Sequence, residues 1–388
     1  MSARAAKFLG YGRQNIDRSD VDAVVSVLSS DFLTQGPAIP RFEAALAEQV
    51  GAKFAVAVSS GGAALHLACL AAELGPGDLG LTAAITFVAS ANCLRYVGAD
   101  VAFVDIDAER LGFASASLAM TLKQSPEATA LIPVHLGGLA HDAAELRRAA
   151  GNRIVIEDAA HALGAAYECG KPVGCCAYGD MAIFSFHPVK SITTGEGGAV
   201  VTNNPDLAQR LRMLRSYGIE RDEDDTRPWL YRMTRLGFNY RMTDIQAALG
   251  LSQLAKLEKF LQRRREIARA YDEVFSSLPH MRLPQSAPRE RARSALHLYI
   301  AVFDFAALGT ERGAVMNELR KRGIGSQVHY IPVYHHPYYA ERYGADRRLF
   351  AEAEAYYRGC LSLPLHPGLT DEDVERVIAG VKQVIGAA

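Results

Sequence analysis

The sequence predicts an α/β protein with a mostly parallel central sheet in a large domain, followed by a smaller α+β domain. Short apolar runs alternate with helix-like segments up to about residue 205. These runs are continuously apolar rather than alternating, as in strands that are buried on both faces of a parallel sheet. Beyond Pro284 and Pro288 the pattern changes to a smaller mixture of strand-like and helix-like segments. The length of 388 residues allows two or three domains.

The elements of the large domain are expected in βαβ order. Residues 64–75 (ALHLACLAAELG) have the pattern of a helix that ends at Gly75, and residues 141–150 have the pattern of another. The predicted strands are 53–60, 99–107, 130–136, 153–160, 181–186 and 197–203. The last two strands are joined by the loop HPVKSITTGE.

A long amphipathic and helix-rich region covers residues 244–278. We place the domain boundary near Gly250, which gives a large domain over 1–250 and a small C-terminal domain over 251–388. The N-terminal segment is counted with the large domain. In the small domain we expect a strand over 297–305, a helix over 313–323 and a strand-like segment over 326–334.

Composition excludes several functional classes. The chain has 42 Lys and Arg against 43 Asp and Glu, a balance that argues against a nucleic-acid binder. Its apolar stretches are too short to span a bilayer, and its N-terminus lacks the apolar core of a signal peptide. The six cysteines show no CxxC spacing, so a reducing cytoplasm is expected. His329 and the adjacent pair His335-His336 could suggest a metal site, but no further ligand accompanies them at metal-site spacing, so no metal is expected.

The first candidate site is the segment Ser59-Ser60-Gly61-Gly62-Ala63-Ala64, which lies between a predicted strand and a helix. Exposed N–H groups at a helix N-terminus, approached closely because of the glycines, can bind an anion. By itself the segment is more typical of an ordinary glycine-rich turn with a helix cap. The chain has no GxxxxGK[ST] motif, and no GxGxxG opens a helix, so neither a P-loop nor a dinucleotide site is expected.

Two ionisable residues follow at other strand ends. Asp158 lies near the end of the strand 153–160, and a buried carboxylate there needs a partner, such as a cationic ring nitrogen. Its alternative role is a cap. Lys190 lies on the loop after the strand 181–186, where burial would lower its pKa and favour a neutral amine for Schiff-base chemistry. Its alternative is a solvated loop lysine.

Taken together and in order, the three signals fit one ligand. An anion cup, an acid and a lysine match a phosphorylated, cationic and carbonyl-bearing ring, and pyridoxal phosphate has these features. The sequence therefore predicts a site for pyridoxal 5'-phosphate at the carboxyl ends of the strands.

The motifs SSGGAALH, ITFVASAN, EDAAHALG, SFHPVKSITTGEGG and GFNYRMTDIQAALG resemble those of the DegT/DnrJ/StrS family of nucleotide-sugar aminotransferases. The resemblance covers the chain from Tyr11 to about Pro364. It implies the aspartate-aminotransferase-like fold, fold type I of the enzymes that depend on pyridoxal phosphate. Within the family, segments such as SSDFLTQGPAIPRFE and SQVHYIPVY resemble the branch that acts in pseudaminic acid biosynthesis.

The resemblance also implies roles for individual residues. Lys190 matches the lysine that forms the Schiff base and moves protons, and Asp158 matches the partner of the pyridine nitrogen. Asn239 matches an asparagine that the other subunit lends to the phosphate, which implies a homodimer with shared sites. The other implied cofactor-binding residues are Ser60, Gly61, Gly62, Phe87, His161 and Ser185. Those implied for the nucleotide-sugar pocket are Tyr11, Asp31, Phe32, Leu33, Thr34, Gln327, Val328, His329 and Tyr330.

One position departs from the family pattern. The family usually has Ser-Ala-Thr where this chain has Ser60-Gly61-Gly62, so a threonine hydroxyl to the phosphate is missing and weaker cofactor binding is expected. Members that dehydrate sugars carry histidine at the position of Lys190, so this lysine favours amino transfer.

The expected reaction is transfer of an amino group from L-glutamate to C4 of a UDP-4-keto-6-deoxy-N-acetylhexosamine. The substrate is expected to be UDP-2-acetamido-2,6-dideoxy-β-L-arabino-hexos-4-ulose. Three alternatives stay open: a different nucleotide 4-keto or 3-keto sugar, a catalytically silent protein on the same fold, and a metal hydrolase, for which a ligand cluster is lacking. Neither nucleic acid nor membrane is an expected partner.

Overall fold

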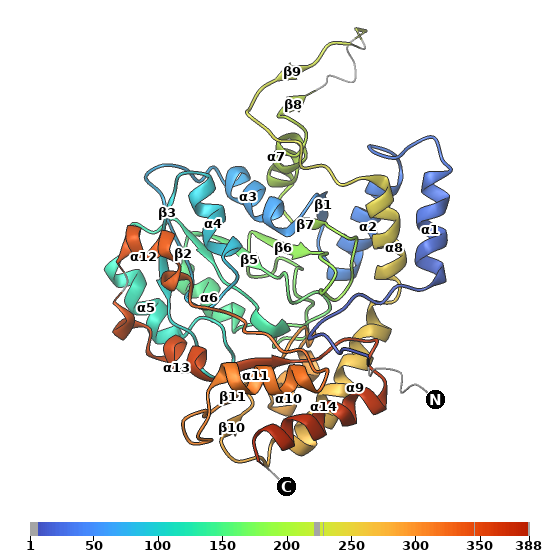
Figure 1. The fold of residues 1–388 in the computed structure, drawn as a ribbon. Coiled ribbons are helices and arrows are strands. Elements are labelled where there is room, and N and C mark those ends of the chain that lie inside the picture. The colour runs from blue at the N-terminus through green and yellow to red at the C-terminus, as the bar shows by residue number, and fades with distance from the viewer. Residues whose placement is uncertain (1–6, 221–225, 228, 345, 387–388) are drawn as a thin grey trace.

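The computed structural model describes residues 7–220, 226–227, 229–344 and 346–386. Its centre is a seven-stranded sheet in the order β1-β7-β6-β5-β4-β2-β3 (Figure 1). The strands are β1 (Phe54–Val58), β2 (Leu79–Ala83), β3 (Asp100–Val104), β4 (Ala130–Ile132), β5 (Ile154–Asp158), β6 (Met181–Ser185) and β7 (Gly198–Thr202).

Only β7 runs against the other strands of this sheet. It pairs antiparallel with both β1 and β6, and every other neighbouring pair is parallel. The prediction of a mostly parallel sheet is therefore confirmed. Because six strands point the same way, the carboxyl ends of β1, β2, β5 and β6 meet at one edge, where α/β sheets bind ligands.

Helices cover both faces of the sheet (Figure 1). Eight of the eleven residues of α3 (Gly61–Ala71) are buried, because this helix packs against β6 and β7. The other helices of this part are α1 (Arg18–Leu28), α2 (Ala38–Val50), α4 (Ala89–Tyr96), α5 (Ser115–Gln124), α6 (Ala143–Ala150), α7 (Pro205–Leu214) and α8 (Asp244–Leu254).

A second sheet, of three antiparallel strands, lies toward the C-terminus (Figure 1). It consists of β10 (Met281–Arg282), β11 (Tyr299–Phe303) and β12 (Cys360–Leu363). The helices of this part are α9 (Leu257–Phe275), α10 (Pro288–Arg293), α11 (Arg312–Lys321), α12 (Pro337–Tyr343), α13 (Ala351–Gly359) and α14 (Asp371–Val384). Leu9, from the segment before α1, packs into the core of this C-terminal part. Its N–H donates to the Gly323 carbonyl, and its own carbonyl accepts the Gly325 N–H.

Three details differ from the sequence predictions. The helical region 244–278 is two helices, because α8 ends at Leu254 and α9 begins at Leu257. Strand β2 was not among the predicted strands. The segment 326–334 is not a strand, because its β-pairing among the described residues is the isolated bridge of Gln327 to Ser362.

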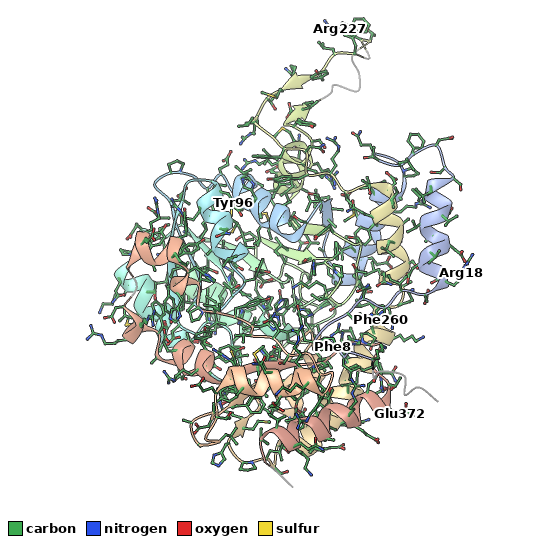
Figure 2. The ribbon with its side chains drawn as sticks, viewed as in Figure 1. Phe8, Arg18, Tyr96, Arg227, Phe260 and Glu372 are labelled. Carbon is green, nitrogen blue, oxygen red and sulfur yellow. The ribbon has the colours of Figure 1, made fainter. Side chains whose placement is uncertain are left out.

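Strands β8 (Ile219–Glu220) and β9 (Arg232–Met233) form a two-stranded arm that projects from the body of the molecule (Figure 1). Arg227 lies at its far end (Figure 2). Trp229, Met233 and Leu236 on this arm are 71%, 64% and 77% exposed. Within the described ranges, every helix is too short or too polar to serve as a membrane span.

One buried carboxylate joins α8 to the segment before α2. Asp244 is 1% exposed, and its two oxygens accept the N–H groups of Gly36 and Ala38, each at 2.8 Å. We expect Asp244→Ala to lower the free energy of unfolding by about 2 kcal/mol, because two N–H groups lose their acceptors. Urea unfolding measures this change. The control Asp22→Ala removes an exposed pair with Arg18 and should cost less than about 0.5 kcal/mol; equal costs would contradict the assignment.

Candidate functional site

A cavity of about 690 Å³ opens at the carboxyl edge of the large sheet. Strands β1, β2, β5 and β6 each lead into it, and the segment 327–331 closes it from the C-terminal part of the chain. The predicted residues that line it are Tyr11, Ser60, Gly61, Gly62, Phe87, Asp158, His161, Ser185, Lys190, Gln327, Val328, His329 and Tyr330. Residues from widely separated parts of the sequence thus meet around one space.

The turn between β1 and α3 forms an anion cup. Ser60 caps α3, because its Oγ accepts the Ala63 N–H at 3.1 Å and its carbonyl accepts the Ala64 N–H at 3.0 Å. Among the described residues, the amides of Gly61 and Gly62 are left without a protein acceptor. A Cβ at Gly61 would lie 2.9 Å from Cβ of Ser185, so the cup fits closely against the end of β6. Such free amides at a helix N-terminus suit a phosphate.

The carboxylate of Asp158 is held at the end of β5. Its side chain is 6% exposed and lines the cavity. The backbone is fixed on both sides, since the Asp158 N–H donates to the Pro133 carbonyl and the Asp158 carbonyl accepts the His135 N–H. Oδ1 accepts the Ala160 N–H at 3.1 Å. The remaining acceptor capacity is available to a cationic group in the cavity.

Lys190 lies on the loop between β6 and β7. Phe186 closes this loop, because its N–H donates to the Gly197 carbonyl and its carbonyl accepts the Thr194 N–H. Burial lowers the pKa of the Lys190 amine to about 8, although the charge of Asp158 acts in the opposite direction. A substantial fraction of the amine is therefore neutral near pH 8, as a nucleophilic lysine requires.

His161 connects the wall of the cavity to Tyr330. Its Nδ1 accepts the Gly137 N–H at 3.3 Å, so the proton of the neutral ring lies on Nε2. Nε2 is 3.3 Å from the Tyr330 hydroxyl oxygen and donates to it. Burial, followed by the nearby charge of Lys190, holds the pKa of His161 well below its usual range. Since the Tyr330 oxygen accepts this bond, its own O–H is free to donate to a ligand.

The C-terminal wall of the cavity is anchored to the small sheet. His329 Nδ1 lies 2.8 Å from the Ser362 Oγ on β12, and burial lowers the pKa of His329 to about 3. Tyr11 packs against the His329 ring, with ring centroids 5.0 Å apart, and its carbonyl accepts the Leu365 N–H. Uncharged groups able to hydrogen-bond, which suit a sugar, thus line this side.

These residues fit pyridoxal phosphate. The cup offers two free amides to the phosphate, Asp158 offers a carboxylate to the ring nitrogen, and Lys190 offers an amine with a lowered pKa. When bound, this cofactor supplies an electron sink for proton transfer at the substrate carbon. Among the described residues, no group of three or more His, Cys, Asp or Glu is arranged to hold a metal ion.

Some predicted residues lie away from this cavity. Phe32 and Leu33, on the loop after α1, are 53% and 47% exposed, and Thr34 forms a bridge with Thr243. Asp31 belongs to the same exposed loop. Asn239 is exposed beside Ser216, near the base of the arm. Within one chain none of these five lines the cavity.

Three polar residues at the site were not singled out from the sequence. Thr86 precedes α4 and Ser90 lies on its first turn, and Ser90 Oγ donates to Asp158 Oδ2 at 2.6 Å. The motif ITFVASAN contains both hydroxyls at an i, i+4 spacing, which is the signal that could have found them. His297, from the C-terminal part, packs against His161 with ring centroids 4.2 Å apart. Only the fold brings these two histidines together.

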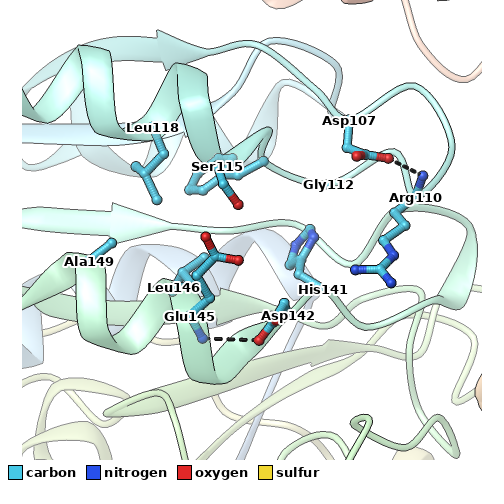
Figure 3. A pocket seen from close by; sticks show the side chains of 11 residues that line it. Asp107, Arg110, Gly112, Ser115, Leu118, His141, Asp142, Glu145, Leu146 and Ala149 are labelled. Carbon is cyan, nitrogen blue, oxygen red and sulfur yellow. Dashed lines mark hydrogen bonds between the residues drawn. The ribbon is translucent and has the colours of Figure 1, made fainter.

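A second cavity, of about 80 Å³, lies between α5 and α6 (Figure 3). Asp107, Arg110, Ser115, His141 and Glu145 are among its lining residues. None of the residues predicted for the functional site lines it. The chemistry indicated by the sequence is therefore concentrated in the larger cavity.

Comparison with known proteins gives a family and several relatives. The model of the DegT/DnrJ/EryC1/StrS aminotransferase family matches residues 14–382. The spore coat polysaccharide biosynthesis protein SpsC of Bacillus subtilis is 37% identical over 388 residues, which cover 98% of each protein.

Two solved structures are similar over almost their full length. PseC of Helicobacter pylori, an aminotransferase involved in the biosynthesis of pseudoaminic acid, has a TM-score of 0.90 and 30% identity, with 98% of this chain and 100% of that chain covered. The sugar aminotransferase Spr1654 of Streptococcus pneumoniae in its PLP-form, described as putative, has a TM-score of 0.88 and 31% identity, with 98% and 99% covered.

The two glycines of the cup should respond differently to substitution. A Cβ at Gly62 would meet only the Ser60 Oγ, at 3.8 Å, whereas a Cβ at Gly61 would press on Ser185. We expect Gly62→Thr to lower the cofactor dissociation constant about threefold to tenfold, because it adds a hydroxyl without a clash, and Gly61→Ala to raise it. Fluorescence titration of the cofactor-free protein measures both. Weaker binding by Gly62→Thr would show that the hydroxyl cannot reach the phosphate.

The Lys190 amine should titrate near pH 8 in the cofactor-free protein. Its labelling by limiting acetic anhydride should therefore rise with pH and level off above about 8. Asp158→Asn should move this midpoint to lower pH, because the Asp158 charge raises the pKa of Lys190. Peptide mass spectrometry reports the labelling, with exposed Lys53 as the internal comparison. A midpoint near the ordinary lysine value would mean that Lys190 is solvated.

Proposed function

The chain belongs to the DegT/DnrJ/EryC1/StrS aminotransferase family, and on that premise we propose that it aminates C4 of UDP-2-acetamido-2,6-dideoxy-β-L-arabino-hexos-4-ulose with L-glutamate as the amino donor. It is a sugar aminotransferase that depends on pyridoxal phosphate. The proposal makes it a transaminase of pseudaminic acid biosynthesis. The likeness to the Helicobacter pylori PseC structure over nearly the whole chain carries this choice of substrate.

In the proposed reaction the chain's own residues have separate tasks. Lys190 would hold the cofactor and would accept and return the substrate proton, for which its lowered pKa is suited. Asp158 keeps the ring nitrogen protonated. The amides of Gly61 and Gly62, with Ser185, bind the phosphate, and Phe87 covers one face of the ring.

The sugar side is proposed to consist of Tyr11 and the segment Gln327–Tyr330. These residues line the same cavity as the phosphate cup and carry several groups that can form hydrogen bonds. A site that bonds the hydroxyl and acetamido groups of a sugar discriminates against analogues that leave those bonds unmade. The Tyr330 hydroxyl is a candidate donor for such a bond, because its oxygen lies 3.3 Å from His161 Nε2 and accepts from it.

Both substrates are anionic, yet Lys190 is the only lysine or arginine among the described residues that line the cavity. We propose that a second copy completes the site in a homodimer, with Asn239 lent to the phosphate of the partner site and the loop Asp31–Thr34 lent to the nucleotide sugar. The exposed positions of these residues in one chain support this proposal. We also propose that the chain divides into a large domain over 1–250 and a small domain over 251–388.

A second candidate is amination of a different nucleotide keto sugar. SpsC, which is more similar to this chain in sequence than PseC, is described as a spore coat polysaccharide biosynthesis protein, and this observation favours the alternative. In either case the proposed partners are a nucleotide sugar and L-glutamate in the cytoplasm, with neither nucleic acid nor membrane involved.

The substrate is tested by direct competition. We expect the L-arabino 4-ketose to be preferred over its D-xylo C5 epimer by about tenfold or more at equal concentration, which corresponds to about 1.4 kcal/mol. Incubation with glutamate, with products defined by NMR, measures the ratio. Equal use of both epimers would favour the second candidate.

The lysine that binds the cofactor is tested by borohydride reduction of the holoenzyme. Peptide mapping should then find the cofactor on Lys190. A label on another lysine would overturn the catalytic assignment.

The shared site is tested by subunit mixing. Lys190→Ala removes the amine, and Asn239→Asp places a negative charge where we expect a phosphate, so each variant should be inactive alone. Mixed subunits should recover activity, because a hybrid dimer contains one site with both residues intact. Exchange is verified by mass spectrometry of intact complexes. Activity that stays absent after proven exchange would place Asn239 in the site of its own chain or outside any site.

A further inference from the structure

A short chain of buried hydroxyl groups leads to Asp158. Ser90, on the first turn of α4, donates from Oγ to Asp158 Oδ2 at 2.6 Å. The Thr86 hydroxyl lies 2.8 Å from the same Ser90 oxygen. Ser90 and Thr86 are 0% and 1% exposed. Neither residue was predicted from the sequence to take part in the chemistry, and the reaction proposed above does not assign them a task.

The direction of these hydrogen bonds follows from counting protons. A serine hydroxyl has one proton, and a carboxylate can only accept, so the Ser90 proton is used in the bond to Asp158. Thr86 must then be the donor to Ser90. Donors thus follow one another from Thr86 to Ser90 to the carboxylate, and hydrogen bonds in such a series strengthen one another.

These hydrogen bonds fix the plane of the Asp158 carboxylate. Oδ2 accepts Ser90 and Oδ1 accepts the Ala160 N–H, so each oxygen has one partner on the protein. The Ser90 hydroxyl is itself held, because its backbone belongs to the first turn of α4 and its oxygen accepts the Thr86 hydroxyl at 2.8 Å. Short hydrogen bonds to a charged acceptor are among the stronger ones in proteins. Because both oxygens are hydrogen-bonded to the protein, rotation of the carboxylate is restricted. Its remaining lone pairs therefore keep a fixed direction.

We propose that Ser90 is a positioning residue for Asp158, with Thr86 orienting Ser90, and that together they aim the carboxylate at the ring nitrogen of the cofactor. This rests on the proposed role of Asp158. Ser90 itself does not touch the reacting atoms. Its task is to keep the carboxylate in the orientation that holds the proton on the ring nitrogen throughout turnover.

The test uses the holoenzyme with ¹⁵N-labelled pyridoxal phosphate. The ¹⁵N shift of the ring nitrogen, measured without substrate, reports how far this nitrogen is protonated. We expect Ser90→Ala to move the shift toward the unprotonated value and to lower kcat about tenfold, with KM for the sugar nearly unchanged. Ser90→Thr, which keeps a hydroxyl, should restore both. Thr86→Val should have a smaller effect in the same direction.

The matched control is Thr82→Val. Thr82 is 0% exposed on β2, and its hydroxyl donates to the Ile132 carbonyl at 3.0 Å without contacting Asp158. It should leave the ¹⁵N shift unchanged even if the protein becomes less stable. A Ser90→Ala protein with a wild-type ¹⁵N shift would overturn the proposal, provided that Asp158→Asn moves the shift. If Asp158→Asn also leaves the shift unchanged, the role of Asp158 itself is wrong.

Discussion

The contact between the start of β7 and the turn after β1 determines the position of most of the site. A Cβ at Gly198 would lie 2.4 Å from the Ser60 carbonyl oxygen, so only glycine lets these segments approach so closely. Since β7 begins directly after the loop of Lys190, this approach holds the lysine loop next to the phosphate cup. Asp158 then reaches the same space from the neighbouring strand pair β5 and β6. The arrangement of these three groups around the cavity thus follows from the strand order and from the close approach at Gly198.

Burial controls the charges around this space. His161, His297 and His329 all have a pKa well below the usual range, with burial as the first cause and the Lys190 charge as a contributor to each. Neutral imidazoles can accept or donate hydrogen bonds without adding positive charge beside the lysine. The cavity therefore combines the carboxylates of Asp158 and Glu196, one easily deprotonated amine and neutral imidazoles, which suits a cofactor enzyme that transfers protons.

The sequence predicted those features that depend on local pattern. Asp158 and Lys190 could be found because each follows a continuously apolar strand. Strand β2 was missed because Gly80 and Thr82 interrupt its apolar run. The break between α8 and α9 has no proline or glycine to mark it. The bond from Ser90 to Asp158 spans 68 residues, and the contact of His297 with His161 joins two parts of the chain, so only the fold could reveal either of them.

The two sides of the cavity belong to different sheets. The phosphate cup, Asp158 and Lys190 are attached to the large sheet, whereas His329 is hydrogen-bonded to β12 and Tyr11 is tied to Leu365 just beyond it. Side-chain substitutions between residues 327 and 331 can therefore reshape this wall of the cavity without removing the hydrogen bonds of Ser60 and Asp158 on the large sheet. The shape of one wall and the chemical groups of the other can thus change independently of each other.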